Sequence, residues 1–218
     1  MSDKEKLVGI CHKVYSNGFV SAYDGNISLK IEEDKYLITR SGFCKGEAEE
    51  KDILAVNSEG NILSGSGKVS AESKLHFYIY KKRPEIRSVV HCHPVFSSAF
   101  AITGNGLSKN IFPEVILTLG KVPLCKYGTP STEELPLSLE PFIEYSWAFL
   151  LENHGAVTIG TTLDDAYFKM EKLEHVSKIL FAARSLGNVS ELSDEDVHKL
   201  LKISKDTYGI LQDERNVF

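Results

Sequence analysis

The chain has 218 residues, of which 42% are hydrophobic and 25% charged, and this composition favours a folded protein with a sizeable core over a disordered one. Its net charge of −5 argues against a nucleic-acid partner, because phosphate backbones are bound by basic surfaces. The longest apolar runs have about five residues, whereas a membrane-spanning helix needs roughly 20. With four scattered cysteines and no C-x-x-C pair, these features predict a cytoplasmic protein with reduced thiols and no membrane partner.

The first half of the chain is predicted to form a helix, two hairpins and a second helix. The first helix spans 3–16, capped by Ser2 with Glu5 at its third position. Alternating polarity predicts one hairpin from 26–31 and 36–39 and another from 53–56 and 62–63. The second helix covers 71–82, with Ser70 as its cap and Pro84 just beyond its end.

The second half is predicted to alternate strands with helices. Strands are expected at 86–91, 122–124, 147–151 and 156–159, and helices at 95–103, from a Thr162 cap to about 186, and at 193–205 before a short tail. Because a regular βαβ succession is missing, we expect an α/β fold of α+β type rather than a doubly wound parallel sheet. The expected architecture is a single domain over 1–218, with a central mixed, largely antiparallel sheet flanked by helices.

The segment VVHCHP places His91 and His93 one residue apart in a β-branched run. On a strand both imidazoles lie on the same side, with Cβ atoms about 6.6 Å apart, so both rings can reach one metal ion. Cys92 then points to the opposite face, where it is expected to be a buried packing residue. His154, in a glycine turn after a buried-looking strand, is the candidate third ligand, and three histidines with an open fourth position are typical of catalytic zinc sites.

A carboxylate and several turn residues are further candidates for the site. Glu72, near a helix start, either complements the helix dipole or acts as a base beside the metal. Asp24-Gly25-Asn26, Arg40-Ser41-Gly42 and Ser70 offer backbone N–H groups and hydroxyls suited to an anion such as phosphate. Each of these segments is a weak signal alone, because glycine, asparagine and serine are ordinary turn residues.

Five segments occur in a characteristic order: GNIS (25–28), SAE (70–72), HCHP (91–94), NHG (153–155) and YG (208–209). Together they resemble the class II aldolase/adducin family, most closely its L-fuculose-1-phosphate aldolase branch. The resemblance implies that His91, His93 and His154 are zinc ligands. It also implies that Glu72 ligates zinc in the resting enzyme and then serves as acid/base. The positions that it assigns to the substrate phosphate are Gly25, Asn26, Ser41, Gly42, Ser70 and Ala71.

Two positions depart from the family pattern. Ala71 replaces a second serine, so one phosphate hydrogen bond is lost or supplied by a backbone N–H. Glu114 aligns with a tyrosine that the fuculose enzymes bring from the neighbouring subunit as a proton donor. A glutamate there is similar to methylthioribulose-1-phosphate dehydratases, which lack the acidic residue matching Glu72. Tyr208 matches a tyrosine of the mobile C-terminal tail that closes over the site.

The function that the resemblance implies is reversible, metal-dependent cleavage of a ketose 1-phosphate to dihydroxyacetone phosphate and an aldehyde. It further implies a homotetramer with the site near a subunit interface. Zn²⁺ is the expected metal, and Mn²⁺ and Co²⁺ stay open because three histidines and a carboxylate accept several divalent ions. A dehydratase or a 4-epimerase of the same family, and a non-catalytic adducin-like binding domain, are the alternatives.

Overall fold

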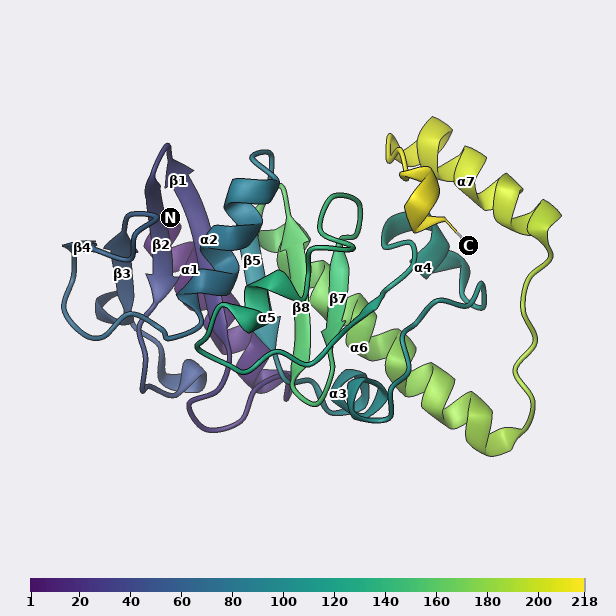
Figure 1. Cartoon of the computed structure of the whole chain (residues 1–218), viewed down its shortest axis with the longest axis horizontal. Helices are drawn as coiled ribbons and strands as arrows, with labels where there is room; N and C mark the ends of the chain where they lie inside the picture. Colours follow the sequence, from purple (N-terminus) through teal and green to yellow (C-terminus); the bar gives the residue numbers. More distant parts are fainter. Residues whose placement is uncertain (218) are drawn as a thin grey trace.

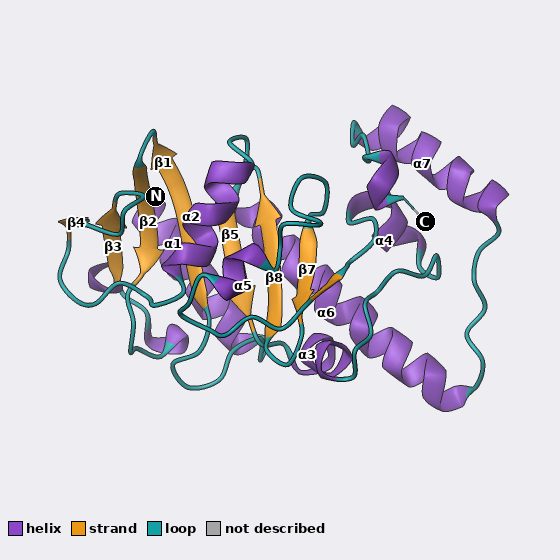
Figure 2. Cartoon of the chain, in the orientation of Figure 1, coloured by secondary structure: helices purple, strands orange, loops and turns teal. Residues whose placement is uncertain are grey.

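The structure, a computed structural model, describes residues 1–217 and is built on one eight-stranded sheet (Figures 1 and 2). The strands are β1 (Asn26–Glu32), β2 (Lys35–Thr39), β3 (Ile53–Val56), β4 (Ile62–Ser64), β5 (Ser88–Cys92), β6 (Leu124–Cys125), β7 (Ala148–Leu151) and β8 (Gly155–Gly160). Their order is β4-β3-β2-β1-β5-β8-β7-β6, and every neighbouring pair is antiparallel except β6 and β7. The predicted mixed, largely antiparallel sheet is confirmed.

Helices cover both faces of this sheet (Figure 2). They are α1 (Asp3–Ser16), α2 (Ser73–Lys82), α3 (Val95–Ile102), α4 (Pro113–Thr118), α5 (Glu134–Leu137), α6 (Leu163–Leu186) and α7 (Asp194–Tyr208), with short 3₁₀ turns at Lys45–Glu47, Glu50–Asp52 and Glu214–Asn216. One core cluster joins the sheet to α1, α3 and α6, and a second joins its other face to α2 and α5. Within residues 1–217, none of the helices combines the length and apolar character needed to cross a bilayer.

The first helix forms as its sequence predicts. The Ser2 hydroxyl accepts the Glu5 N–H at 3.0 Å, and the Glu5 carboxylate accepts the Ser2 N–H, completing a capping box. The helix buries its predicted apolar stripe, which consists of Leu7, Ile10, Cys11 and Val14. This stripe packs α1 against one face of the sheet.

Several predicted boundaries were wrong. Helix α2 begins at Ser73 rather than 71, because the Ser70 hydroxyl accepts the Glu72 N–H in a turn before the helix. The strand predicted over 122–124 is β6 at Leu124–Cys125, since Val122 forms only an isolated bridge with Leu107. Strand β5 runs over Ser88–Cys92 instead of 86–91. Helix α7 continues to Tyr208, three residues past the predicted end, where Gly209 adopts a left-handed conformation.

The strand register gathers the functional candidates at one end of the sheet. Asn26, which begins β1, pairs directly with His91 of β5, and Cys92 pairs with Ala156 of β8. Along β5, Val90 and Cys92 pack in the cluster on the α1 side, whereas Val89 packs in the cluster under α2. His91 therefore faces α2. The prediction that Cys92 is a buried packing residue on the opposite face is confirmed.

Candidate metal centre and anion pocket

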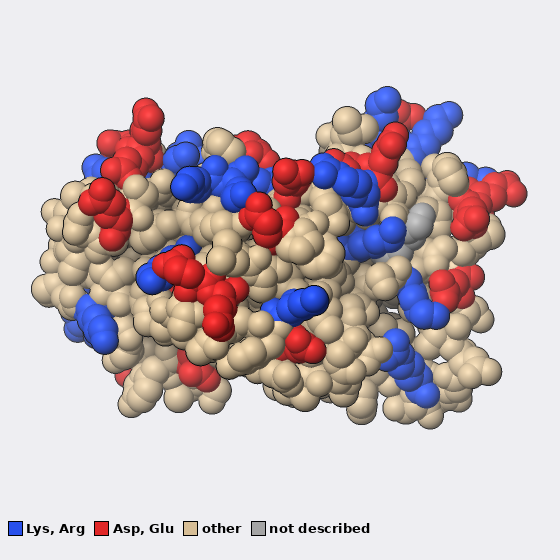
Figure 3. Space-filling model, in the orientation of Figure 1, with Lys and Arg blue, Asp and Glu red and all other residues tan. Residues whose placement is uncertain are grey.

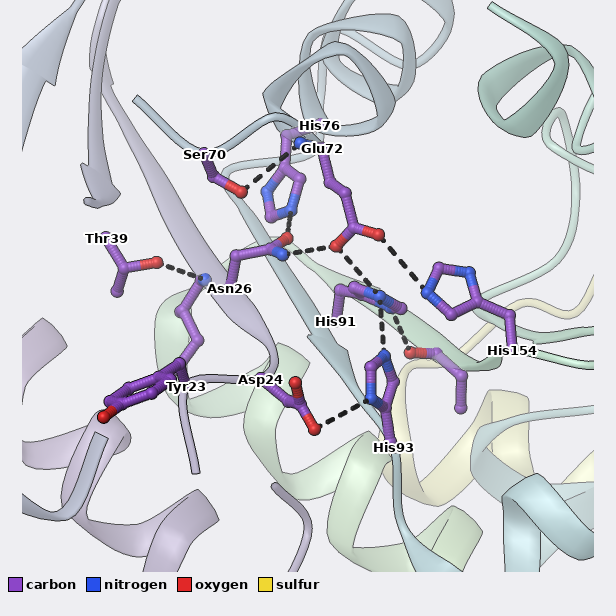
Figure 4. A network of polar contacts seen from close by, with 12 residues as sticks. Tyr23, Asp24, Asn26, Thr39, Ser70, Glu72, His76, His91, His93 and His154 are labelled. Atoms are coloured by element: carbon purple, nitrogen blue, oxygen red, sulfur yellow. Dashed lines mark hydrogen bonds and ion pairs between the residues drawn. The ribbon is translucent and has the colours of Figure 1, made fainter. Parts of the chain in front are cut away.

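Three histidines converge at this end of the sheet (Figure 4). His91 is the penultimate residue of β5, His93 follows that strand, and His154 lies in the turn between β7 and β8. One ring nitrogen from each lies within 4.8 Å of the others, and the Nε2 atoms of His91 and His93 are 3.3 Å apart. Such a group of nitrogens is able to hold a metal ion, as the spacing of the first two histidines predicts.

Glu72 lies against this histidine cluster at the N-terminal cap position of α2. Its Oε2 is 3.3 Å from Nε2 of His91, and its Oε1 is 3.3 Å from Nε2 of His154. Asn26 Nδ2 donates to Oε2 at 2.7 Å. Burial by itself raises the pKa of Glu72, but the facing histidines and Asn26 outweigh burial and hold the pKa well below its usual range. The carboxylate is therefore ionised beside the three imidazoles.

The surroundings of each histidine suit a metal ligand. His91 Nδ1 lies 3.0 Å from the Ala156 carbonyl oxygen and donates to it, which directs Nε2 toward the cluster. Burial by itself lowers the pKa of His91, but the facing Glu72 carboxylate outweighs burial and raises it. Burial, with the neighbouring His91 and His154, lowers the pKa of His93 to about 3, so this ring is neutral. His154 Nδ1 is buried and has no hydrogen-bond partner within residues 1–217. Three imidazoles and one carboxylate form a donor set suited to Zn²⁺ and to similar divalent ions.

A cavity of about 220 Å³ opens beside the histidine cluster. Five of the six residues predicted to hold phosphate line it; the exception is Gly42, which lies in the adjacent turn with φ +77°. The lining consists of Tyr23, Asp24, Gly25, Asn26, Arg40, Ser41, Lys45, Ser70, Ala71, Glu72, His93 and Ser131. Glu72 and His93 thus belong both to the cluster and to this anion pocket, so a molecule in the pocket lies next to both.

Two cations line the anion pocket: Arg40 belongs to a segment that the sequence singled out for an anion, whereas Lys45 was not predicted. Arg40 is neutralised by Asp52, whose Oδ1 lies 2.7 Å from Nη2 and 2.8 Å from Nε. Lys45 is only 1% exposed, and within residues 1–217 no carboxylate lies close enough to pair with it. Its Nζ donates to the carbonyls of Tyr23 and Phe43 at 3.3 Å, and burial lowers its pKa.

Sequence patterns offered little sign of Lys45 and Ser131. A lysine in the turn GFCKGE is normally a surface residue, and nothing in the sequence indicates that Lys45 is buried. Ser131 reaches the pocket from a loop far along the chain, at a φ of +68°, and no short motif marks it. Both positions depend on tertiary packing.

Glu114 and Tyr208 lie away from the histidine cluster in this protomer. Glu114 is in α4, and Tyr208 is the last residue of α7, so its predicted place in a tail beyond the helix was wrong. These helices pack together beyond the β6 edge of the sheet, and the Ser204 hydroxyl of α7 donates to the Leu117 carbonyl of α4 at 2.7 Å (Figure 1). A role in the site for either residue stays a prediction.

The outer surface carries charges of both signs. On the face in Figure 3, Lys and Arg side chains are interspersed with Asp and Glu side chains. The ion pairs Lys74–Glu133 and Lys82–Glu140 join α2 to the α5 region at 2.7 and 2.6 Å. This face has no broad field of one sign, so the unpaired Lys45 inside the anion pocket is the more distinctive electrostatic feature.

Comparison with known proteins gives one family. Residues 5–181 match the family described as Class II Aldolase and Adducin N-terminal domain. The 3-oxo-tetronate 4-phosphate decarboxylase of Escherichia coli K12 is 31% identical over 182 residues, which is 82% of this chain and 85% of that protein. The L-fuculose phosphate aldolase of Methanocaldococcus jannaschii is 34% identical over 177 residues, 81% of this chain and 94% of that protein.

A solved structure agrees with these sequence matches. An L-fuculose 1-phosphate aldolase superposes with a TM-score of 0.84 at 27% identity, covering 94% of this chain and 98% of that one. The family match covers most of the chain, and two relatives exceed 30% identity over more than four-fifths of it. The chain therefore belongs to the class II aldolase and adducin family.

Proposed function

We propose that this protein is a metal-dependent aldolase that cleaves a ketose 1-phosphate, similar to L-fuculose 1-phosphate, to dihydroxyacetone phosphate and an aldehyde. The observation that carries the proposal is the position of the Glu72 carboxylate. It contacts His91, His154 and Asn26 together, so a proton-transfer group stands between a metal-binding cluster and an anion pocket. Cleavage next to a carbonyl in a phosphorylated sugar needs these three functions side by side.

The histidine cluster would hold the cofactor. His91, His93 and His154, with Glu72 in the resting state, would hold Zn²⁺, or Mn²⁺ or Co²⁺ in its place. When bound, the ion supplies a Lewis acid that polarises the substrate carbonyl and stabilises developing negative charge on oxygen. His91 is suited to this ligand role because its bond to the Ala156 carbonyl fixes both the ring and its tautomer.

The anion pocket would bind the substrate phosphate. Asn26, Ser41 and Ser70 supply side-chain donors, and Gly25 and Ala71 leave room for the phosphate to approach backbone N–H groups. Where the family has a second serine, Ala71 would donate only through its backbone. The unpaired Lys45 ammonium would supply the positive charge that a phosphate dianion requires. Phosphate binding then fixes the three-carbon half of the substrate beside Glu72.

Glu72 would carry out the proton transfer. Breaking the carbon–carbon bond leaves an enediolate of dihydroxyacetone phosphate and releases the aldehyde half. The hydroxyl proton of the departing aldehyde half goes to solvent, and Glu72 takes up a proton from solvent. The carboxyl group of Glu72 then donates this proton to the enediolate carbon, which gives dihydroxyacetone phosphate. In the synthetic direction, the Glu72 carboxylate removes that proton.

The second candidate is decarboxylation of a 3-oxo acid phosphate, and the similarity to 3-oxo-tetronate 4-phosphate decarboxylases supports it. Loss of CO₂ from 3-oxo-tetronate 4-phosphate leaves the same enediolate, which Glu72 would protonate in the same way. Only the departing half differs. An aldehyde leaves after its hydroxyl proton is removed, whereas CO₂ leaves without proton transfer, so residues beyond the histidine cluster would decide between the reactions.

Product analysis separates the two candidates. The purified protein, loaded with Zn²⁺, is incubated with L-fuculose 1-phosphate, L-ribulose 1-phosphate and 3-oxo-tetronate 4-phosphate, and the products are identified by NMR. The aldolase proposal predicts dihydroxyacetone phosphate together with one equivalent of aldehyde. Release of CO₂ from the 3-oxo acid alone would overturn it in favour of the decarboxylase, and an intact carbon chain would indicate a dehydratase or an epimerase.

We also propose a cytoplasmic homotetramer in which a neighbouring subunit brings Glu114 and Tyr208 to the aldehyde side of the site. The separation of both residues from the histidine cluster within one protomer supports this arrangement. Mixing inactive Glu72→Gln and Glu114→Gln subunits tests it, because shared sites would restore activity that neither parent has. Activity that stays at the parental level in proven mixed oligomers would contradict the arrangement.

A further inference from the structure

A line of four hydrogen bonds, three of them buried, connects Glu72 to Tyr80 through the space between β1 and α2. Asn26 Nδ2 donates to Glu72 Oε2 at 2.7 Å, and Asn26 Oδ1 lies 2.6 Å from Nε2 of His76. On the other side of the ring, His76 Nδ1 lies 2.6 Å from the Ser28 hydroxyl, which lies 2.6 Å from the Tyr80 hydroxyl. His76 and Ser28 are 0% exposed (Figure 4 shows the end of the line near Glu72).

The chemistry of the groups fixes the direction of every bond in this line. The ionised Glu72 carboxylate only accepts, so Asn26 turns its NH₂ group toward Glu72 and its oxygen toward His76. Burial and the nearby His91 lower the pKa of His76 to about 3, so the ring carries a single proton. That proton must be on Nε2, because Asn26 Oδ1 has none to offer.

The same reasoning extends to the far end of the line. With its proton on Nε2, His76 can only accept at Nδ1, so the Ser28 hydroxyl donates to it. The Ser28 oxygen then accepts from the Tyr80 hydroxyl. All four bonds therefore run one way, from Tyr80 to Glu72, and neither the histidine nor the asparagine can reverse without breaking two bonds.

We propose that His76 is a positioning residue that orients the Asn26 amide for two tasks at once. By holding Asn26 Oδ1, His76 turns both Nδ2 hydrogens toward the site, one to Glu72 and the other to an anion in the pocket that Asn26 lines. A single amide thus contacts both the proton-transfer group and the substrate phosphate. This inference rests on the proposed function for the identity of the anion. Its consequence is that phosphate binding and the orientation of Glu72 depend on one another.

Two replacements of His76 separate the hydrogen bond from the space that the ring fills. His76→Gln keeps an N–H near the position of Nε2, whereas His76→Phe keeps a ring without any donor. Inorganic phosphate is titrated into each variant and into the wild-type protein without added metal, and the ¹H–¹⁵N signals of the Asn26 side chain are followed. We expect His76→Phe to weaken phosphate binding by about tenfold, the effect of one lost hydrogen bond, and His76→Gln by about twofold.

Steady-state kinetics give a second readout with the metal-loaded enzyme. Because Asn26 contacts both groups, His76→Phe should raise KM for the sugar phosphate and lower kcat, whereas a purely structural role would reduce the amount of active protein and leave KM unchanged. Tyr80→Phe serves as the matched control at the far end of the line, where Ser28 still donates to His76. It should change both constants by less than about twofold.

The tautomer of His76 can be tested without any substitution. Long-range ¹H–¹⁵N correlation spectra of the wild-type protein should show a proton on Nε2 and none on Nδ1. The opposite tautomer would overturn the proposal, even if His76→Phe failed to fold. Equal damage by His76→Phe and His76→Gln would also overturn it, since the shape of the side chain and not its donor would then matter.

Failure of this proposal can be told apart from failure of the proposed function. If the wild-type protein turns over a sugar phosphate but both His76 variants bind phosphate with wild-type affinity, only the positioning role is lost. If the wild-type protein shows neither turnover of sugar phosphates nor a phosphate-induced change at Asn26, the proposed function fails, and the positioning role fails with it.

Discussion

The carboxylate of Glu174, from the middle of α6, accepts the Ser97 backbone N–H at 2.9 Å and the Ser97 hydroxyl at 2.8 Å. Its other oxygen accepts the Phe96 N–H at 3.1 Å. These donors are in the first turn of α3, which begins two residues after His93. Glu174 is only 2% exposed, so a negative charge is buried against the positive end of a helix, where the helix dipole and free N–H groups stabilise it. It anchors the segment that follows His93 to the longest helix.

Glu174→Ala should therefore destabilise the fold. Three donors at the start of α3 would lose their acceptor in a buried place, which costs about 3 kcal/mol of unfolding free energy. Urea denaturation measures the loss. His175→Ala, at an exposed position of the same helix, is the control and should cost no more than about 0.5 kcal/mol. Equal losses in the two variants would show that the contact with α3 does not stabilise the fold.

His91→Ala should abolish stoichiometric metal binding. The ring is fully buried, and its Nε2 faces the Glu72 carboxylate and His93, so no other described side chain can take its place. Metal content is measured by elemental analysis after loading with Zn²⁺ and dialysis. His198→Ala, which removes an exposed histidine of α7, should keep the wild-type content. One equivalent of metal retained by His91→Ala would contradict the assignment of His91 as a ligand.

Glu72→Gln should remove proton transfer and leave the fold intact. Glutamine has nearly the same shape as glutamate, but it cannot take up the proton of dihydroxyacetone phosphate, so solvent exchange at that carbon should slow by about 10²- to 10⁴-fold. Incorporation of deuterium, followed by NMR, measures the exchange. Glu133→Gln, an exposed carboxylate paired with Lys74, should exchange at the wild-type rate. Near-normal exchange in Glu72→Gln would exclude Glu72 as the base.

Lys45→Met should weaken binding of the phosphorylated substrate without loss of stability. The ammonium is buried without a carboxylate partner among the described residues, so its removal relieves a desolvation cost while methionine keeps most of the volume. KM for the sugar phosphate should rise by about tenfold or more, because a charged hydrogen bond to phosphate is lost. Lys51→Met, at an exposed lysine of the next 3₁₀ turn, is the control. An unchanged KM with a lower melting temperature would make Lys45 a structural residue.

The pH dependence of stability should reveal His76. Its pKa is about 3 in the folded protein and 6.5 ordinarily, so below pH 6.5 the unfolded chain binds a proton that the folded chain does not. The stabilisation is complete above pH 6.5 and is lost as the pH falls toward 3. Between pH 7 and pH 5 this amounts to about 2 kcal/mol of unfolding free energy.

Denaturation of the wild-type protein and of His76→Gln at pH 7 and pH 5 measures the contribution of His76 to the unfolding free energy. The variant should lose about 2 kcal/mol less than the wild type on going from pH 7 to pH 5. His198→Gln, at an exposed position, should follow the wild-type dependence. If His76→Gln loses as much stability as the wild type, the ring is not held neutral.

Local sequence signals located most elements but not all of their ends. The Ser2–Glu5 capping box and the apolar stripe of α1 act within one helix, and the structure has them as predicted. The start of α2 was misplaced because the Ser70 hydroxyl bonds within a turn, and the end of α7 because Gly209, not the charged residues before it, ends the helix. A few competing local hydrogen bonds decide where such a helix begins or ends, and the outcome cannot be predicted from composition.

The sequence by itself determined the candidate metal-binding residues and their local geometry. His91 and His93 lie close together because residues two apart share one side of an extended chain, and Cys92 packs on the other face for the same reason. The ordered motifs were also enough to indicate the family, although not the reaction.

Only the tertiary structure decided what surrounds these candidate residues. The pairing of Asn26 with His91 across β1 and β5 brings the anion pocket to the histidine cluster, and the packing of α2 on that face adds Glu72 and His76. The same packing buries Lys45 without a carboxylate partner and separates Glu114 and Tyr208 from the cluster. These relations join residues far apart in the chain, and strand register and helix packing set them, so no local sequence pattern carries them.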